Sequence, residues 1–282
     1  MSSPQKVWFV TGTSQGFGLE LVRAALDRGD AVVATSRKPA EVAAAFPQAA
    51  DRLLAVSLDL RDPASIAGTV RAALERFGRI DVLVNNAGYG IYGAVEEVSD
   101  EEAQAVFEIN VFGLLRLTRA VLPSMRQRKA GHIVNLSSFG GLVGVPGAGI
   151  YCATKFALEG LSDSLAAEAA PLGVGVTLVE PGPFRTNFLG DSLVRAKEVI
   201  ADYAETAGKA RAALDTRHGN QAGDPVRAAL AIVQAVTAPK PPRRLLLGRF
   251  AYEKVQEKFA QMQEEFSAWR EVTVGADYPE AG

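Results

Sequence analysis

The sequence contains little cysteine, no long hydrophobic run and no excess of charge of either sign. Its single cysteine, Cys152, cannot form an internal disulfide, and the N-terminus has only the short apolar run 7–10. These features predict a reducing, cytoplasmic location without secretion. No segment approaches the roughly 18 apolar residues of a membrane span, because charged residues or glycines interrupt every hydrophobic stretch. We therefore expect a soluble protein without a membrane partner.

Charge and composition narrow the class of protein further. The 282 residues include 30 basic and 32 acidic residues, a formal net charge of −2, so nucleic acid is not an expected partner. Aromatic residues make up 7% of the chain and hydrophobic residues 48%, a composition typical of a parallel sheet covered by helices. His132 and His218 lack neighbours at the spacing of metal ligands, so no metal is expected.

Short apolar runs alternate with stretches of helical spacing, which is the pattern of repeated βαβ units. We predict strands at residues 6–11, 31–36, 53–57, 80–84, 132–136, 175–179 and 244–247. We predict helices at residues 16–28, 39–46, 63–77, 100–128, 151–172, 225–236 and from 249 to 269. The pattern indicates an α/β fold, a single-domain Rossmann-type doubly wound sheet of about seven parallel strands with helices on both faces.

Two segments fall outside this alternation. Residues 183–223 are charged and rich in alanine, and we interpret them as a substrate-loop insertion over the carboxyl edge of the sheet. Their apolar residues fit a lid, and they fit equally well an exposed amphipathic helix with a buried apolar face. Residues 249–282 are interpreted as a C-terminal helical extension. The whole chain, residues 1–282, is expected to form one domain.

A glycine-rich turn directly follows the first predicted strand. Gly12, Gly16 and Gly18 form the pattern Gly-x-x-x-Gly-x-Gly and lead straight into a predicted helix. Gly12 would permit a tight turn, Gly16 the close approach of a pyrophosphate, and Gly18 close packing of the helix. Glycines also occur in ordinary loops between strands and helices. The order of strand, turn and helix nevertheless predicts a dinucleotide-binding site, because the helix N-terminus then faces the phosphates.

Tyr151 and Lys155 are four residues apart in a predicted helix, so their side chains share one face. An ammonium group near the phenol would favour phenolate and lower a tyrosine pKa that is otherwise about 10. The spacing predicts that Tyr151 exchanges a proton with a substrate oxygen at neutral pH.

The motifs and their order resemble those of the short-chain dehydrogenase/reductase family over about residues 6 to 250. The resemblance extends to 17-beta-hydroxysteroid dehydrogenase-like and retinol-type members, through Val-Thr-Gly-Thr-Ser at residues 10–14 and the long 183–223 segment. Besides the glycine turn, the matching motifs are Asn-Asn-Ala-Gly at residues 85–88, Asn110, Ser138 at thirteen residues before Tyr151, Tyr-x-x-x-Lys at 151–155 and Pro-Gly-x-x-x-Thr at 181–186.

The resemblance implies a catalytic set of four residues. Ser138 would hydrogen-bond the substrate oxygen, Tyr151 would exchange the proton, and Lys155 would bind the cofactor ribose and tune Tyr151. The backbone of Asn110 would hold a water that links Lys155 to solvent. Ser137 would be able to replace Ser138, but the family spacing selects Ser138 and leaves Ser137 to bond backbone in the turn.

The resemblance also implies a nicotinamide cofactor. Asp59 would meet the adenine amino group, although an aspartate after a strand is commonly a turn former. Asn86 would lie beside the adenosine ribose, Gly88 would stabilise the central sheet, and Thr186 would lie near the carboxamide. The residues expected to contact the cofactor are Gly12, Ser14, Gln15, Gly16, Phe17, Gly18, Arg37, Asp59, Leu60, Asn86, Ala87, Gly88, Tyr151, Lys155, Pro181, Gly182 and Thr186.

The end of the second predicted strand favours NADP(H) over NAD(H). Residues 35–38 read Thr-Ser-Arg-Lys and lack the carboxylate that would bind the ribose hydroxyls and exclude a 2′-phosphate. Arg37 is suited to pair with that phosphate, while the alternative is that Arg37 and Lys38 only solvate the next helix. Some NADP-binding family members have a basic residue where this chain has Gln15, so discrimination would rest on Arg37.

We therefore expect an NADP(H)-dependent oxidoreductase, a carbonyl reductase that interconverts a ketone or aldehyde and an alcohol by hydride transfer. A bulky apolar small molecule is the expected substrate. The alternative is an NADP(H)-binding redox sensor without turnover, against which the intact catalytic set argues. The helices from Val111 and Tyr151 resemble those that pair subunits in the family, which implies a homodimer or homotetramer unless the C-terminal helix blocks one interface.

Overall fold

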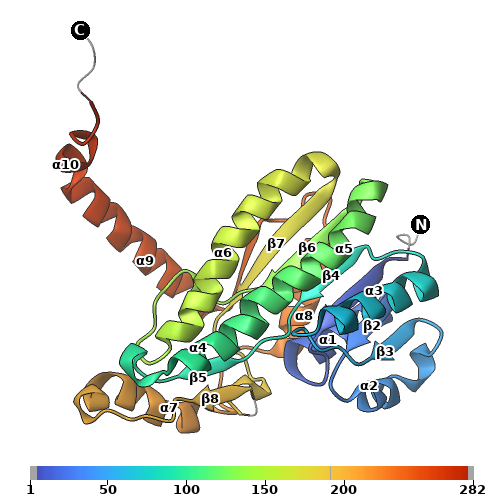
Figure 1. Cartoon of the computed structure of the whole chain (residues 1–282), viewed down its shortest axis with the longest axis horizontal. Helices are drawn as coiled ribbons and strands as arrows, with labels where there is room; N and C mark the ends of the chain where they lie inside the picture. Colours follow the sequence, from blue (N-terminus) through green and yellow to red (C-terminus); the bar gives the residue numbers. More distant parts are fainter. Residues whose placement is uncertain (1–4, 191, 279–282) are drawn as a thin grey trace.

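A computed structural model describes residues 5–190 and 192–278 (Figure 1). The expected single domain, insertion and C-terminal extension also include residues 1–4, 191 and 279–282, which lie outside the described residues. The main sheet has seven strands in the order β3-β2-β1-β4-β6-β7-β9, and every neighbouring pair is parallel. The strands are β1 (Val7–Thr11), β2 (Ala31–Thr35), β3 (Leu53–Val56), β4 (Val82–Asn85), β6 (Gly131–Leu136), β7 (Val174–Pro181) and β9 (Arg244–Leu247).

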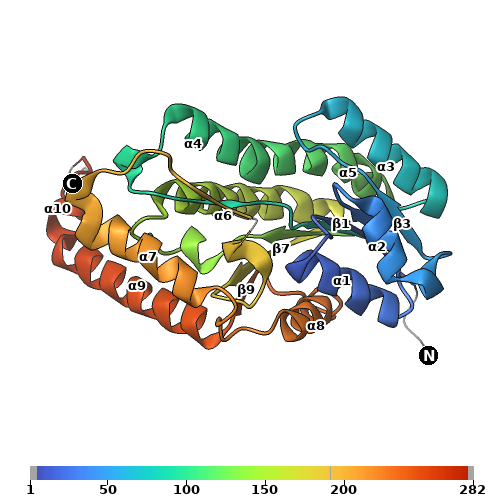
Figure 2. The same cartoon turned by 90° about the horizontal axis from the view of Figure 1, so that it is seen from below.

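Helices cover both faces of this sheet, so the predicted doubly wound α/β fold is confirmed (Figures 1 and 2). Helices α1 and α8 lie on one face, and α3, α5 and α6 lie on the other. The helices are α1 (Gly16–Asp27), α2 (Pro39–Ala45), α3 (Pro63–Phe77), α4 (Asp100–Phe107), α5 (Leu114–Arg128), α6 (Gly149–Ala169), α7 (Lys209–Arg217), α8 (Pro225–Val236), α9 (Arg249–Ala268) and α10 (Arg270–Val274).

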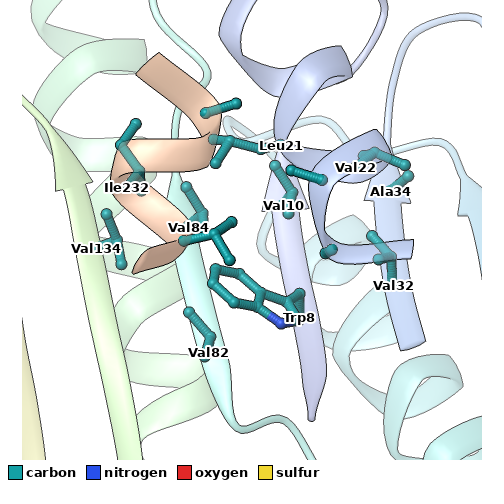
Figure 3. Close-up of a cluster of buried hydrophobic side chains, with 14 of the residues drawn as sticks. Trp8, Val10, Leu21, Val22, Val32, Ala34, Val82, Val84, Val134 and Ile232 are labelled. Atoms are coloured by element: carbon teal, nitrogen blue, oxygen red, sulfur yellow. The ribbon is translucent and has the colours of Figure 1, made fainter. Parts of the chain in front are cut away.

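Strand β1 shows how the sequence pattern builds the two layers. All five of its residues are buried, as expected for a strand in the middle of a parallel sheet. Because side chains alternate between faces, Trp8 and Val10 pack against α1 and α8, whereas Phe9 packs under α5. Figure 3 shows Trp8 beneath Ile232 of α8 and beside Val84. The indole nitrogen of Trp8 donates to Asp30 at 3.0 Å, so its polar atom is satisfied within the core.

The predicted helix over residues 100–128 is divided in the structure. Helix α4 begins with a capping box between Ser99 and Glu102, and α5 begins only at Leu114. Between them, Glu108–Gly113 form a wider helical turn. A Cβ on Gly113 would lie 2.8 Å from the Cβ of Leu60, so only glycine allows this turn to pack against the loop after β3.

A second, two-stranded sheet is present that was not predicted. Strands β5 (Gly90–Tyr92) and β8 (Leu193–Arg195) pair in parallel, with three residues each. Such short strands have no recognisable period. Through this pairing, part of the 183–223 segment lies beside the loop that follows β4. Figure 1 shows β8 and α7 next to β5, near the beginning of α6.

The two ends of the 183–223 segment are hydrogen-bonded to each other. The amide of Arg185 donates to the Gly223 carbonyl at 2.8 Å, and the amide of Gly223 donates to the Pro183 carbonyl at 3.1 Å. Further along, the buried carboxylate of Glu97 accepts hydrogen bonds from the Ile200 amide at 2.9 Å and from Arg211. The 183–223 segment therefore leaves the body and returns to it at the same place, and contacts with Glu97 hold its middle part against the body.

Candidate active site

The carboxyl ends of β1, β4, β6 and β7 meet at one edge of the sheet. The strand order reverses between β1 and β4, and in open α/β sheets ligands bind outside the carboxyl ends at such a point. The glycine turn follows β1, and Asn86 follows β4. Ser138 follows β6, and Pro181 is the last residue of β7. The fold thus brings four separate motifs of the sequence to one place.

The glycine turn has a backbone that other residues would strain. Gly12 and Gly16 have φ values of +69° and +59°, in the left-handed region that favours glycine. A Cβ on Gly12 would lie 3.0 Å from the Cα of Ala87, and one on Gly16 would lie 3.2 Å from the Cβ of Thr186. The turn therefore packs closely against both the loop after β4 and the loop after β7.

The start of α1 fits a dinucleotide phosphate. Helix α1 begins at Gly16 with no side-chain cap and no acidic residue in its first turn, so its free amides can bind an anion. The neighbouring Gln15 contacts the 183–223 segment, because the side-chain nitrogen of Asn187 donates to the side-chain oxygen of Gln15 at 3.2 Å. Phe17 packs on Phe184, with ring centroids 5.1 Å apart. Ser14 is exposed in the turn.

Asn86 joins the glycine turn to the loop after β4. Its side-chain amide donates to the carbonyl oxygens of Thr11 at 2.7 Å and Gly12 at 3.0 Å. In return, the Thr11 hydroxyl accepts hydrogen bonds from the backbone amides of Asn86 and Ala87, both at 2.9 Å. This role of Thr11 was not predicted. Its position as the last residue of the first strand was the available signal.

Ser138 and Tyr151 form the centre of the candidate site. The Ser138 hydroxyl accepts a hydrogen bond from the Gly140 amide at 3.0 Å, which fixes its orientation. Burial raises the pKa of Tyr151 strongly, and a hydrogen bond with the Ser138 side chain acts in the opposite direction. The expectation that the pKa of Tyr151 falls toward neutrality is therefore wrong for this structure. A raised pKa keeps the phenol protonated, as a proton donor requires.

Lys155 lies one helical turn after Tyr151, as the spacing predicts. Its ammonium nitrogen is 5.7 Å from the centre of the Tyr151 ring and donates to the Leu136 carbonyl at 2.7 Å. Burial lowers the pKa of Lys155 to about 8, while the Glu159 carboxylate acts in the opposite direction. The strand β6 thus holds the ammonium group beside the tyrosine.

Asn110 lies in the wider helical turn and is buried. Its side-chain oxygen accepts from the Tyr89 amide at 3.0 Å, and its side-chain nitrogen donates to the Tyr89 carbonyl at 2.9 Å and to Thr154 at 3.2 Å. A Cβ on Gly88 would lie 2.9 Å from the Asn110 side-chain oxygen and 3.9 Å from the Lys155 ammonium nitrogen. Gly88 therefore leaves room for Asn110 and Lys155 to approach each other.

A buried acidic cluster behind the site was not predicted. The Ser137 hydroxyl donates to Glu159 at 2.5 Å, so the expectation that Ser137 bonds backbone through this group is wrong. Arg244 lies 3.3 Å from the carboxyl groups of both Glu159 and Glu180, and the two carboxyl oxygens of Glu180 are buried without a hydrogen-bond partner among the described residues. Burial and the neighbouring Glu159 raise the pKa of Glu180 to about 8. A glutamate within the apolar run of β7 was the signal available in the sequence.

The residues expected to bind the adenosine half of the cofactor lie at the carboxyl ends of β2 and β3. Arg37 is exposed and has no hydrogen-bond or ion-pair partner among residues 5–190 and 192–278. Asp59 instead forms a two-point ion pair with Arg61, with nitrogen–oxygen distances of 3.0 and 2.7 Å. These hydrogen bonds lower the pKa of Asp59 to about 2. Leu60, which follows Asp59, is buried. Arg61 is a second basic group here that the sequence analysis did not consider.

Apolar side chains from the 183–223 segment lie against the tyrosine. The ring centroids of Tyr151 and Phe188 are 5.6 Å apart. A Cβ on Gly90 would lie 3.1 Å from atoms of both Phe188 and Leu193, so β5 and this segment are in close contact. Thr186 lies between this apolar group and the glycine turn, and Gly182 packs near Ala251.

The described part of the chain has neither a cluster of metal ligands nor a membrane-spanning helix. Within residues 5–190 and 192–278, no three His, Cys, Asp or Glu side chains are grouped so that they could hold a metal ion. Over the same residues, no helix combines the length and apolar character needed to cross a bilayer.

Comparisons with known proteins identify the family of the chain. The family described as short chain dehydrogenase matches residues 6–196. Oxidoreductase BOA17 of Botryotinia fuckeliana is 36% identical over 96% of this chain and 99% of its own. Human 17-beta-hydroxysteroid dehydrogenase type 1 is 36% identical over 84% of this chain and 76% of its own.

Solved structures show the same fold. A short-chain dehydrogenase from Streptomyces avermitilis is 43% identical, with a TM-score of 0.91 over 98% of this chain and 100% of its own. That coverage extends into the C-terminal helices. Three further structures, 26 to 30% identical, are complexes with 5-hydroxy-NADP, NADH and NADP+.

Proposed function

The chain belongs to the short-chain dehydrogenase/reductase family, and from this premise we propose that it is an NADP(H)-dependent oxidoreductase that interconverts a ketone or aldehyde and an alcohol. One observation carries the proposal. Tyr151 lies with the centre of its ring 5.7 Å from the Lys155 ammonium nitrogen, and it shares the carboxyl edge of the sheet with Ser138 and with a glycine turn suited to a dinucleotide.

Each side chain has a distinct role in the proposed reaction. Ser138 donates a hydrogen bond to the substrate oxygen, and Tyr151 gives its proton to that oxygen during reduction. Lys155 supplies positive charge that favours the phenolate left on Tyr151. The side chain of Asn110 holds the loop at Tyr89 close to Lys155. The backbone of Asn110 would bind a water molecule that links Lys155 to solvent, so that Tyr151 can regain its proton. When bound, the nicotinamide supplies the hydride equivalent.

We infer NADP(H) rather than NAD(H) from the free charge at the end of β2. Arg37 has no protein partner among the described residues, so its guanidinium is available for a 2′-phosphate. Asp59 is held by Arg61, which leaves this end of the site with an uncompensated positive charge. The similar structures hold both phosphorylated and unphosphorylated cofactors, so the choice depends on residues of this chain.

We infer a bulky apolar substrate from the surroundings of Tyr151. Phe188 lies against the tyrosine ring, and Leu193 lies near Phe188 through their shared contact with Gly90. Both belong to the 183–223 segment, which we propose as the substrate loop. The steroid named for the human relative is a molecule of this class. Phe188→Ala should raise KM for bulky apolar ketones several-fold and change KM for a small ketone less. Equal changes for both would contradict an apolar substrate contact.

The experiment that tests the function is turnover by the purified protein. Loss of NADPH absorbance is followed with a panel of ketones, aldehydes and quinones, and NADH is assayed in parallel. The proposal predicts turnover of at least one carbonyl with NADPH, abolished by Tyr151→Phe. Tight binding of NADPH without turnover of any carbonyl would favour a redox sensor instead.

Two further proposals concern the state of the protein in the cell. We infer a homodimer or homotetramer, because Phe112 and Phe156, beside α5 and on α6, are 48% and 46% exposed. Light scattering at micromolar concentration tests this, and a monomer mass would contradict it. We also propose a cytoplasmic location, which fractionation of expressing cells tests through recovery in the cytosolic fraction.

A further inference from the structure

The C-terminal helices form an arm that leaves the body of the protein. Helix α9 begins directly after β9 and extends away from the sheet, with α10 at its far end (Figure 1). Only Ala251 and Val255 of α9 are buried, and both lie in its first two turns. We call residues 256–274 the arm. No residue of the arm is buried, so the body of the chain, as far as the structure describes it, does not cover it.

Apolar residues of α9 and the arm follow a regular spacing. They alternate at three and four residues, which places them along one side of a helix as in a coiled coil. The side chains on this stripe are Tyr252, Val255, Phe259, Met262, Phe266 and Trp269, and the next position of the series is Thr273. Phe259, Phe266 and Trp269 are 49%, 61% and 66% exposed. The heptad pattern thus continues beyond the point at which α9 leaves the body.

Helix α9 ends at Ala268, and α10 begins after Trp269. The φ and ψ of Trp269, −104° and 11°, depart from helical values, so the helix is interrupted at this residue and two backbone hydrogen bonds cross the joint. The amide of Trp269 donates to the Glu265 carbonyl at 3.3 Å, and the amide of Thr273 donates to the Trp269 carbonyl at 2.9 Å. Phe266, Trp269 and Val274 line an open hollow at this joint. An isolated helix of this length is only marginally stable in water, and the exposure of an aromatic stripe to water is also unfavourable. The arm therefore requires a partner that covers the stripe.

We propose that the arm pairs with the arm of a second copy of this chain, in parallel and in register. The heptad spacing is the pattern by which two helices cover each other's apolar stripes. Counted along the sequence with Phe259 and Phe266 at the first position of the heptad and Met262 and Trp269 at the fourth, Glu265 takes the seventh position, and Arg270, the first residue of α10, takes the fifth. In a parallel pair these positions face each other across the seam, five residues apart.

The charges of the arm support this partner over a membrane surface. Parallel pairing brings Glu265 of each copy opposite Arg270 of the other, so two ion pairs flank the aromatic seam. A helix that binds an anionic membrane surface carries an excess of Lys and Arg on its polar face. The arm, residues 256–274, instead contains four acidic and two basic residues. The pairing does not depend on the proposed cofactor or substrate.

Cysteine cross-linking tests the pairing and its direction. The native Cys152 is buried at 3% exposure and is the single cysteine, so an introduced cysteine reports alone. In a parallel, in-register pair, position 262 faces itself across the seam at a distance that a disulfide can span. Met262→Cys should form a covalent dimer under mild oxidation. Glu264→Cys, on the opposite side of the helix, is the matched control and should not cross-link.

Two results would overturn the proposal. They are a failure of Met262→Cys to cross-link at micromolar protein, and equal cross-linking at 262 and 264, which indicates random collision. Phe266→Glu should also halve the mass of the wild-type assembly in light scattering, and an unchanged mass contradicts arm pairing. Co-sedimentation of the wild type with phosphatidylcholine and phosphatidylserine vesicles, lost in Phe266→Glu, would assign the stripe to a membrane and overturn the proposal.

A charge exchange tests the ion pairs across the seam. Glu265→Arg should weaken association a few-fold, because it places like charges opposite each other. The double variant Glu265→Arg/Arg270→Glu should restore the wild-type association constant. Equal weakening in the single and double variants would contradict the parallel register, since it would show that the two positions do not meet.

Discussion

A Cβ atom on Gly18 would lie 2.1 Å from the carbonyl oxygen of Gly12 and 2.7 Å from the side-chain nitrogen of Asn86. The first turn of α1 therefore touches the backbone of the glycine turn. This contact fixes the direction in which the free amides of α1 point. Cofactor binding therefore depends on the absence of a side chain at Gly18.

Gly18→Ala should abolish measurable cofactor binding and destabilise the protein by about 1–3 kcal/mol, because the added methyl group forces α1 and the glycine turn apart. The measurements are NADPH titration by fluorescence and unfolding in urea. Gly68→Ala is the matched control. Gly68 lies in α3, where a Cβ would meet nothing within 4 Å, so alanine there should stabilise the helix by up to about 1 kcal/mol. Unchanged NADPH binding in Gly18→Ala would refute the close contact.

Arg37→Asp should reverse the cofactor preference. Loss of a charge-assisted hydrogen bond to a phosphate costs about 1.5–3 kcal/mol, so the dissociation constant of NADPH should rise about tenfold to a hundredfold. The new carboxylate would bind ribose hydroxyls, and NADH should bind more tightly. Arg71→Asp makes the same change at an exposed position of α3 and should leave the preference unaltered. An equal loss in both variants would mean that only net charge matters.

His132 should make the stability of the protein depend on pH in the acid range. Its side chain lies between β6 and β7, 2.8 Å from the Thr177 hydroxyl, and burial lowers its pKa to about 4. Between pH 6.5 and 4 the unfolded chain therefore binds a proton that the folded chain does not. The free energy of unfolding should fall as pH falls through this window, with a contribution from His132 of up to about 3 kcal/mol.

His132→Gln should reduce this acid loss of stability. The comparison is the urea midpoint of wild type and variant at pH 7 and at pH 4.5. Gly175 packs on the histidine ring, where its Cβ would lie 2.5 Å from Nδ1, so some loss of stability at both pH values is expected from the changed shape. His218→Gln changes the other, exposed histidine and should keep the wild-type dependence. If His132→Gln loses as much stability on acidification as the wild type, another group is responsible.

The layers of the fold and the location of the site follow from local patterns in the sequence. All seven strands of the main sheet were predictable, because a strand buried on both faces, such as β1, is a continuous apolar run. The glycine turn and the pair of Tyr151 and Lys155 were predictable for a similar reason. Their signals lie within a few neighbouring residues, and the alternation of strands and helices then brings them to one edge.

Features that depend on distant contacts were not predictable in this way. Strands β5 and β8 are each three residues long and exist only because they pair with each other. The direction of the Tyr151 pKa shift depends on burial by residues from other elements, which spacing along one helix does not report. The same holds for Ser137, whose partner Glu159 lies on another element.

The central claim is that Tyr151 transfers the proton, and single-turnover reduction by Tyr151→Phe tests it most directly. The variant keeps the ring that packs on Phe188 and removes only the hydroxyl. Tyr278→Phe, at an exposed position, is the control. The account predicts that Tyr151→Phe binds NADPH as the wild type does and reduces a carbonyl about 10²–10⁴-fold more slowly, while Tyr278→Phe is unaffected. A wild-type reduction rate in Tyr151→Phe would contradict it.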